Sequence, residues 1–384
     1  MAEKRELRGI AWDHPRGYEP LRATSKVFSR ENPGVTITWD IRSLKAFGDM
    51  PIEDLIGQYD LITIDHPYMG QAHKNNLLLP LEKSLPKEAL RELKAESVGP
   101  SFDTYVYNDH LYAVPIDAAA IVAASRTDLM ARYGLVAPKT RSQLREFYQG
   151  LPQSLAVAWP LCATDLWCSF LSLCAQDGNR QFIEQGTIDE QIGSAVLNEL
   201  KGHLEYVHPQ SLYWNPIQVL DEMANKDNIV YCPFLFGYTN YSRLGFAKEI
   251  VHFLDSPANP KNQVSTILGG VGLAVSRYCE HPDIAAAYAH FVAKAQTQEK
   301  LYTENGGQPA NIKAWQSQEN NELCQGFFHN TQGTMERAYV RPRHPGWNGF
   351  QERGSELLHQ GILKDEESGI LMKRLNELYR SKEQ

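Results

Sequence analysis

Three features are missing from this 384-residue sequence: a basic excess, a long apolar run and paired cysteines. The formal net charge is −8, and no lysine- or arginine-rich block is present. Binding to nucleic-acid phosphates needs a positive surface, so we expect no nucleic-acid partner. The longest apolar stretches, such as residues 267–275, are shorter than the roughly 20 residues that cross a bilayer. The chain is therefore not predicted to span a membrane.

The six cysteines show neither CxxC nor any other metal-ligand spacing, which argues against a zinc site. Cys168 and Cys174 fall in an apolar helical run and are interpreted as buried small hydrophobic residues, a usage that favours a reducing compartment. Walker-type, GxSxG and HExxH motifs are also missing, so phosphoryl transfer, serine hydrolysis and zinc proteolysis have no support. We expect no cofactor, no metal and no catalytic residue of these classes.

The N-terminal segment, residues 1–8, is charged and leads directly into a predicted strand, without the apolar centre of an export signal. Two explanations of this missing signal stay open. Either a signal peptide has been removed from the sequence, or the protein works in the cytoplasm.

A chain of this length exceeds what one hydrophobic core usually serves, which predicts two lobes with a cleft between them. The first part alternates strands and helices, in residues 7–12, 18–29, 35–39, 43–59 and 60–64. This βαβαβ order predicts an α/β fold with mostly parallel sheets flanked by helices. In such sheets ligands bind beyond the carboxyl ends of the strands.

Further along the chain, a strand from the turn at residue 109 to residue 124 is long enough to run from one lobe into the other. Thr140 is predicted to cap a helix over residues 141–149. The other predicted elements are strands over 229–233 and 267–275 and helices over 282–295, 355–363 and 369–379.

Several short segments carry a resemblance along essentially the whole chain. They are YDLITID (59–65) with the leucine-rich segment 77–81, DHLYAVP (109–115), ASRTDL (124–129), LGG with AVS (268–276) and GGQP (306–309). Their order is similar to that of the extracellular solute-binding protein family 1, which includes the maltose-binding proteins. The sequence departs from the family pattern at Ala124 and near Ser142, where tyrosine and tryptophan are usual.

The resemblance implies a two-lobed, type II periplasmic-binding-protein-like fold. The N-terminal lobe would hold residues 1–117 plus 266–312, and the C-terminal lobe residues 118–265 plus 313–384. Crossing segments are expected near 117–122, 264–267 and 311–318, with hinge closure around a ligand.

The implied function is capture of a small polar solute, a carbohydrate or polyol, for an ABC importer. We expect a monomer at the cell surface or in the periplasm, with an ABC permease as partner if the chain is exported. One alternative is a cytoplasmic enzyme on this fold that uses two Asp-His pairs for acid/base chemistry or metal binding. Another is a ligand sensor that presents its closed state to a soluble regulator.

The two Asp-His-Pro segments follow the first and third predicted strands. Because these loops meet at one edge of the sheet, Asp13, His14, Asp65 and His66 are predicted to line one cleft and bind ligand. A carboxylate there accepts hydrogen bonds from sugar hydroxyls. The alternative for Asp13 is a helix N-cap followed by Pro15.

The resemblance places two further ligand-binding candidates. Asp117 falls where the family has an acid at the first crossing, and its alternative is a turn residue or a partner for Arg126. Trp347 falls where relatives have an aromatic platform for a sugar ring, and its alternative is burial against the last helices.

An aromatic segment after the strand at 229–233 supplies two candidates for an opposite platform, Tyr238 and Tyr241, with Trp12 and Trp214 as weaker ones.

The positive charge at residues 341–344 suits either binding of an acidic ligand or a solvated surface.

Overall fold

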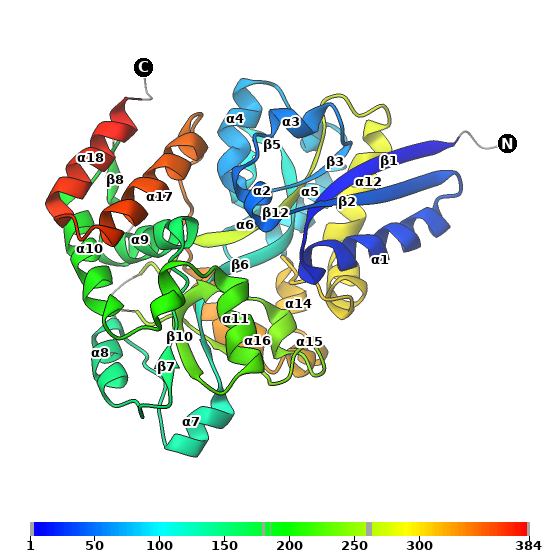
Figure 1. The fold of residues 1–384 in the computed structure, drawn as a ribbon. Coiled ribbons are helices and arrows are strands. Elements are labelled where there is room, and N and C mark those ends of the chain that lie inside the picture. The colour runs from blue at the N-terminus through cyan, green and yellow to red at the C-terminus, as the bar shows by residue number, and fades with distance from the viewer. Residues whose placement is uncertain (1–3, 179–180, 185, 259–262, 382–384) are drawn as a thin grey trace.

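The computed structural model describes residues 4–178, 181–184, 186–258 and 263–381. Residues 1–3 of the charged N-terminal segment lie outside the described residues. The chain forms two lobes (Figure 1). The strands β1 and β2, with α1 and α12, lie at the N-terminal side of the molecule, and α9, α10, α17 and α18 form a helical layer at the opposite side (Figure 1). This arrangement confirms the predicted two-lobed α/β fold.

Within the described ranges, seven strands follow one hydrogen-bonded path, β2-β1-β3-β12-β6-β10-β7, and an eighth, β11, pairs with β6 off that path. Their bounds are β1 (Arg5–Trp12), β2 (Val35–Arg42), β3 (Leu61–Ile64), β6 (Ala113–Ser125), β7 (Ala156–Val157), β10 (Ile229–Phe236), β11 (His252–Leu254) and β12 (Leu268–Val275). Two small hairpins pair β4 (Val106–Tyr107) with β5 (His110–Leu111) and β8 (Ile183–Glu184) with β9 (Thr187–Ile188).

The sheets are mixed, so the expectation of mostly parallel sheets needs correction. β1 pairs in parallel with β2 and β3, as the βαβαβ order predicts. β12 lies antiparallel between β3 and β6, and it enters the sheet after the chain has passed through the second lobe.

The long strand β6 belongs to both lobes. All 13 of its residues are buried. Residues Ala113–Ala120 pair with β12, and residues Ile121–Ser125 pair with β10 and β11. The predicted passage of this strand from one lobe to the other is therefore confirmed, and it joins the two sheets into one path.

At the crossing, the backbone of β12 lies close to that of β6 at Gly270. The φ angle of Gly270 is +116°, and a Cβ atom there would lie 2.4 Å from the carbonyl oxygen of Asp117. Only glycine fits this position without strain. The register shifts between Val271 and Gly272 immediately afterwards, so the strand bends where the lobes meet.

Six α-helices precede β6 among the described residues: α1 (Pro15–Glu31), α2 (Leu44–Asp49), α3 (Glu53–Ile56), α4 (Met69–Lys74), α5 (Lys87–Ala95) and α6 (Ser101–Thr104). The single helix predicted over 43–59 was wrong. Pro51 follows Met50, the residue that caps α2, and proline disfavours helical backbone at the residue before it.

The helices between β6 and β12 are α7 (Thr127–Tyr133), α8 (Arg141–Gln149), α9 (Ala163–Gly178), α10 (Glu190–Leu204) and α11 (Pro216–Asn225). Those after β12 are α12 (Pro282–Ala293), α13 (Ala295–Thr297), α14 (Ile312–Gln316), α15 (Gln318–Leu323), α16 (Phe327–Glu336), α17 (Trp347–Leu363) and α18 (Ser368–Arg380). A capping box of Thr140 and Gln143 starts α8 as predicted. α17 begins earlier than the predicted residue 355.

Two large buried clusters form the cores of the lobes. One draws its residues from 7–116 and 271–302. The other draws them from 121–264, from residue 267 and from 339–379. The domain boundaries at residues 117/118, 265/266 and 312/313 stay a prediction. In the described part of the chain, no helix combines the length and the apolar character that crossing a membrane requires.

Candidate functional site

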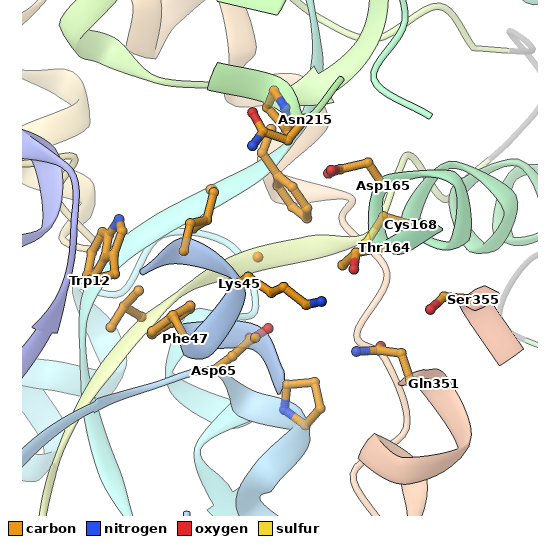
Figure 2. Close-up of a pocket in the computed structure, with 18 of the residues that line it drawn as sticks. Trp12, Lys45, Phe47, Asp65, Thr164, Asp165, Cys168, Asn215, Gln351 and Ser355 are labelled. Atoms are coloured by element: carbon orange, nitrogen blue, oxygen red, sulfur yellow. The ribbon is translucent and has the colours of Figure 1, made fainter. Parts of the chain in front are cut away.

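A cavity of about 470 Å³ lies between the lobes, which is within the usual size of small-molecule sites. Residues from the N-terminal parts of α9, α11 and α17 line one side of it, and residues of α2 and the loop after β3 line the other (Figure 2). Ala119 of β6 and Gly269–Val271 of β12 also line it, so the strand crossing forms part of the wall.

Three of the seven predicted ligand-binding residues line this cavity: Asp65, Asp117 and Tyr238. The other four, Asp13, His14, His66 and Trp347, are not among the lining residues. The expectation that both Asp-His pairs line one cleft therefore needs correction for three of its four side chains.

Asp13 and His14 have other surroundings. The Asp13 side chain is exposed, and its backbone N–H donates to the carbonyl oxygen of Arg42 at 2.7 Å. His14, not Asp13, caps α1, because its Nδ1 accepts a hydrogen bond from the backbone N–H of Arg16 at 3.0 Å. Burial, together with the nearby Arg16 charge, lowers the pKa of His14 to about 3. His14 is thus a neutral capping residue behind the cavity wall.

Asp65 reaches the cavity, whereas His66 is turned into the lobe. One Asp65 oxygen accepts from the backbone N–H of His66 at 2.8 Å, and the other accepts from Arg341 at 2.5 Å. Burial opposes ionisation, but the Arg341 guanidinium and His66 more than offset it and hold the pKa of Asp65 well below its usual range. His66 is 1% exposed, and burial lowers its pKa to about 4.

Trp347 is 0% exposed and packs in the helical layer. Its ring lies near those of Trp167, Phe350 and Tyr379. The residue starts α17, and the first turn of that helix lies against α9 and α18. Trp347 is therefore buried against the last helices, which is the alternative given for it, and it presents no platform to the cavity.

Asp117 forms a buried ion pair with Arg16. Its two oxygens accept from Nε and Nη2 of Arg16 at 2.8 and 2.6 Å. Arg16 also donates to the carbonyl oxygen of Gly237 at 2.7 Å, and its guanidinium lies 4.7 Å from the ring centre of Tyr238. Burial lowers the pKa of Arg16, but the Asp117 carboxylate more than offsets this and raises it.

The predicted alternative partner of Asp117, Arg126, instead pairs with Asp128 and Asp227.

The two arginines of residues 341–344 both form hydrogen bonds within the protein. Arg341 is 4% exposed and binds Asp65, and Arg343 donates to the carbonyl oxygens of residues 103, 104 and 106. Neither arginine is a solvated surface residue.

Asp165, in the first turn of α9, is a cavity residue that sequence reasoning missed. Its Oδ2 accepts a hydrogen bond from the thiol of Cys162 at 3.0 Å. Burial raises the pKa of Asp165 to about 7, with only the Cys162 hydrogen bond acting against this. The available signal was the polar pair Thr164-Asp165 at the start of an apolar helical run, which is typical of a helix N-terminus.

The remaining lining residues combine flat apolar groups with hydrogen-bonding side chains. Trp12, Phe47 and Phe236 supply the apolar faces. Figure 2 shows the side chains of Lys45, Asn215, Gln351 and Ser355 around the same space. Such a wall offers rings for the C–H faces of a ligand and donors and acceptors for its polar edge.

The chemistry proposed for the Asp-His alternative finds no support here. Neither imidazole lines the cavity, and both have pKa values far below neutrality because they are buried. Within the described ranges, no three His, Cys, Asp or Glu side chains are placed to hold a metal ion. Burial also raises the pKa of Cys162 far above its usual range, which keeps it a thiol.

Asp165→Asn is expected to stabilise the unliganded protein at pH 8 but not at pH 4. The pKa of Asp165 is raised by folding, so between about pH 4 and pH 7 the unfolded chain releases this proton while the folded chain keeps it. Stability contributed by the protonated group is lost across that window and stays lost above it. Denaturant unfolding should show a gain of about 2 kcal/mol for the variant at pH 8. Equal differences at both pH values would contradict the raised pKa.

Part of the chain matches a known sequence family, and nearly all of it matches solved structures. Residues 11–162 match the sequence family of bacterial extracellular solute-binding proteins. No curated protein sequence matches the chain.

Solved structures match almost its full length. Maltose-bound MalE3 of T. maritima has a TM-score of 0.85 at 16% identity, covering 98% of this chain and 99% of that one. A solute-binding protein of an ABC transporter from Agrobacterium radiobacter, in complex with ribitol, has a TM-score of 0.82 at 16% identity, covering 99% of both chains. One from Agrobacterium vitis with bound D-mannitol has a TM-score of 0.79 at 14% identity, covering 98% of both chains. The resemblance predicted from the sequence is thus confirmed: residues 11–162 match the bacterial extracellular solute-binding protein family, and the chain has the fold of these proteins over nearly its whole length.

Proposed function

We propose that this protein captures a carbohydrate or polyol between its lobes and presents it to an ABC importer. The observation that carries the proposal is the cavity itself, whose wall combines flat rings with many hydrogen-bonding groups. The structural neighbours bind maltose, ribitol and D-mannitol, which are ligands of this kind.

The geometry suits a ligand rich in hydroxyl groups. Arg341 and Arg16 hold the carboxylates of Asp65 and Asp117 in place. Little conformational entropy of these side chains is therefore lost when a ligand binds. Hydrogen bonds to such ionised groups are stronger than those between neutral groups. Phe236 and Trp12 add apolar surface for the carbon skeleton.

Ligand binding by Asp65, Asp117 and Tyr238 belongs to this proposal. So do an extracellular or periplasmic location, a monomeric state and an ABC permease as the partner of the closed form. The family match to extracellular solute-binding proteins supports the location.

Adding a bound sugar or polyol should raise the melting temperature. Mass action gives about 2.7 kcal/mol of stabilisation when the free ligand is at a hundredfold excess over its dissociation constant. A thermal-shift screen of mono- and oligosaccharides and of sugar alcohols, including maltose, ribitol and D-mannitol, measures it. Calorimetric titration of each hit then gives the dissociation constant.

The screen tests the proposed ligand class and distinguishes a binding protein from an enzyme. No shift with any sugar or polyol would refute the ligand class. A hit recovered chemically altered after incubation with equimolar protein, as read by mass spectrometry, would favour an enzyme over a binding protein.

A further inference from the structure

In the ranges that the structure describes, some of the charged residues on the cavity wall form ion pairs with one another, and the others do not. Both arginines of the wall are already engaged, Arg16 with Asp117 and Arg341 with Asp65. These four charges cancel in two pairs. The sign of the charge presented to a ligand therefore depends on the charged lining residues that remain.

Four charged lining residues remain, and no ion pair joins any of them to another side chain in the described part of the chain. One is basic, Lys45, and three are acidic: Asp165, Glu352 and Glu356. In a cleft with low-dielectric walls such an excess concentrates cations and repels anions. Neither arginine is free to bind an acidic ligand, so such a ligand would have Lys45 to pair with and three acidic residues to repel it.

Of these three acidic residues Asp165 is the least exposed to solvent, since it is half-buried whereas Glu352 and Glu356 are exposed. Its carboxylate points into the cavity (Figure 2). Among the described residues its side chain receives one hydrogen bond, from the Cys162 thiol at 3.0 Å, and thiols are weak donors. Three other titratable groups interact electrostatically with Asp165: Cys168, Cys232 and Tyr238. All three are neutral at pH 7 and supply no positive charge.

We infer that the ligand carries a protonated amino group beside its hydroxyls, and that Asp165 is the residue that binds this group. An ammonium group has three donors and a full positive charge, so it satisfies a partly desolvated carboxylate better than a hydroxyl does. The arrangement thus selects an amino sugar or amino polyol over its neutral analogue. This inference rests on the proposed capture of a sugar or polyol in the same cavity.

Matched pairs of ligands test the inference directly. D-glucosamine is compared with D-glucose and N-acetyl-D-glucosamine, D-galactosamine with D-galactose, and the amino polyol D-glucamine with D-sorbitol. In calorimetric titrations at pH 7 and low salt, the amine of at least one pair should bind ten times tighter or more than its neutral partners. The uncharged N-acetyl compound separates the charge from the size of the substituent.

Proton release gives a second readout. Burial raises the pKa of Asp165 to about 7, and a bound cation would lower it again, so amine binding should release protons. Calorimetric titrations in buffers of different ionisation enthalpy measure the number of protons released. A neutral analogue should release fewer. A purely steric preference for the amine would not produce this difference.

Asp165→Asn should reduce the amine preference to about threefold or less and abolish the proton release. Glu319→Gln is the matched control, because Glu319 is an exposed acid in the first turn of α15, away from the cavity, and it should keep both effects.

Each outcome decides between the two proposals. Tight binding of neutral compounds without an amine preference, or an Asp165→Asn variant that keeps the preference, overturns the inference and leaves the proposed function intact. Binding of no compound in the panel refutes the proposed function, and the inference falls with it.

Discussion

Asp117→Asn is expected to lower the free energy of unfolding by about 3 to 5 kcal/mol, because it leaves the Arg16 charge buried without its counter-charge. Asp117 is 1% exposed and Arg16 is 4% exposed, so water can approach the unpaired guanidinium only from the cavity that both residues line. The remaining hydrogen bond from Arg16 to the Gly237 carbonyl compensates for only part of this loss. Urea unfolding followed by far-UV circular dichroism measures the effect.

Two variants sharpen this experiment. The double substitution of Arg16→Met and Asp117→Leu removes both charges and should recover most of the lost stability, because desolvation of the pair offsets much of its attraction. Glu88→Gln breaks the exposed pair with Arg91 and should change stability by less than about 1 kcal/mol. If Asp117→Asn were no more destabilising than Glu88→Gln, the buried pair would not be an important support of the crossing.

The elements that sequence reasoning placed well are those with strong local signals. The strand–helix alternation before residue 64 follows hydrophobic period and turn residues, and the structure has β1, α1, β2 and β3 there. Asp65 was found because a general rule puts ligands beyond the carboxyl ends of strands, and it does line the cavity. Thr140 was found because a capping box is readable from four residues.

The same strand-end rule failed for Asp13 and His14, for a local reason. His14 turns inward to cap α1, and the backbone of Asp13 is tied to Arg42, so neither side chain enters the cavity. The pattern Asp-His-Pro does not encode which of its two side chains caps the helix. His66 differs again, since its ring is buried within the lobe.

Long-range partners are the part that the sequence could not supply. Arg16 lies 101 residues from Asp117, and Arg341 lies 276 residues from Asp65, so no periodicity or motif joins them. Asp165 was missed for a related reason, because its importance comes from the lack of a basic partner nearby. For Trp347 the choice between platform and core depended on the start of α17, and helix boundaries are weakly encoded.

Gly70→Ala is expected to weaken ligand binding at least tenfold and to lower the free energy of unfolding by about 3 kcal/mol. A Cβ atom on Gly70 would lie 1.9 Å from the carbonyl oxygen of Arg343, far inside van der Waals contact. The Arg343 segment cannot yield easily, because its guanidinium donates to three carbonyl oxygens of residues 103–106 at 2.7–2.8 Å. Relief would require a shift of the backbone that leads into α17.

That shift would move the cavity wall, since Asn348, Gln351 and Glu352 of α17 line it. Gly202→Ala is the matched control. Gly202 lies inside α10 with open space around its Cβ position, so alanine there should gain up to about 1 kcal/mol from helix propensity and leave affinity unchanged. Titration of both variants with a ligand from the thermal-shift screen, beside urea unfolding, checks the pair. If the Gly70 variant bound as tightly as the Gly202 variant, the contact between α4 and residues 343–345 would not determine the position of the wall.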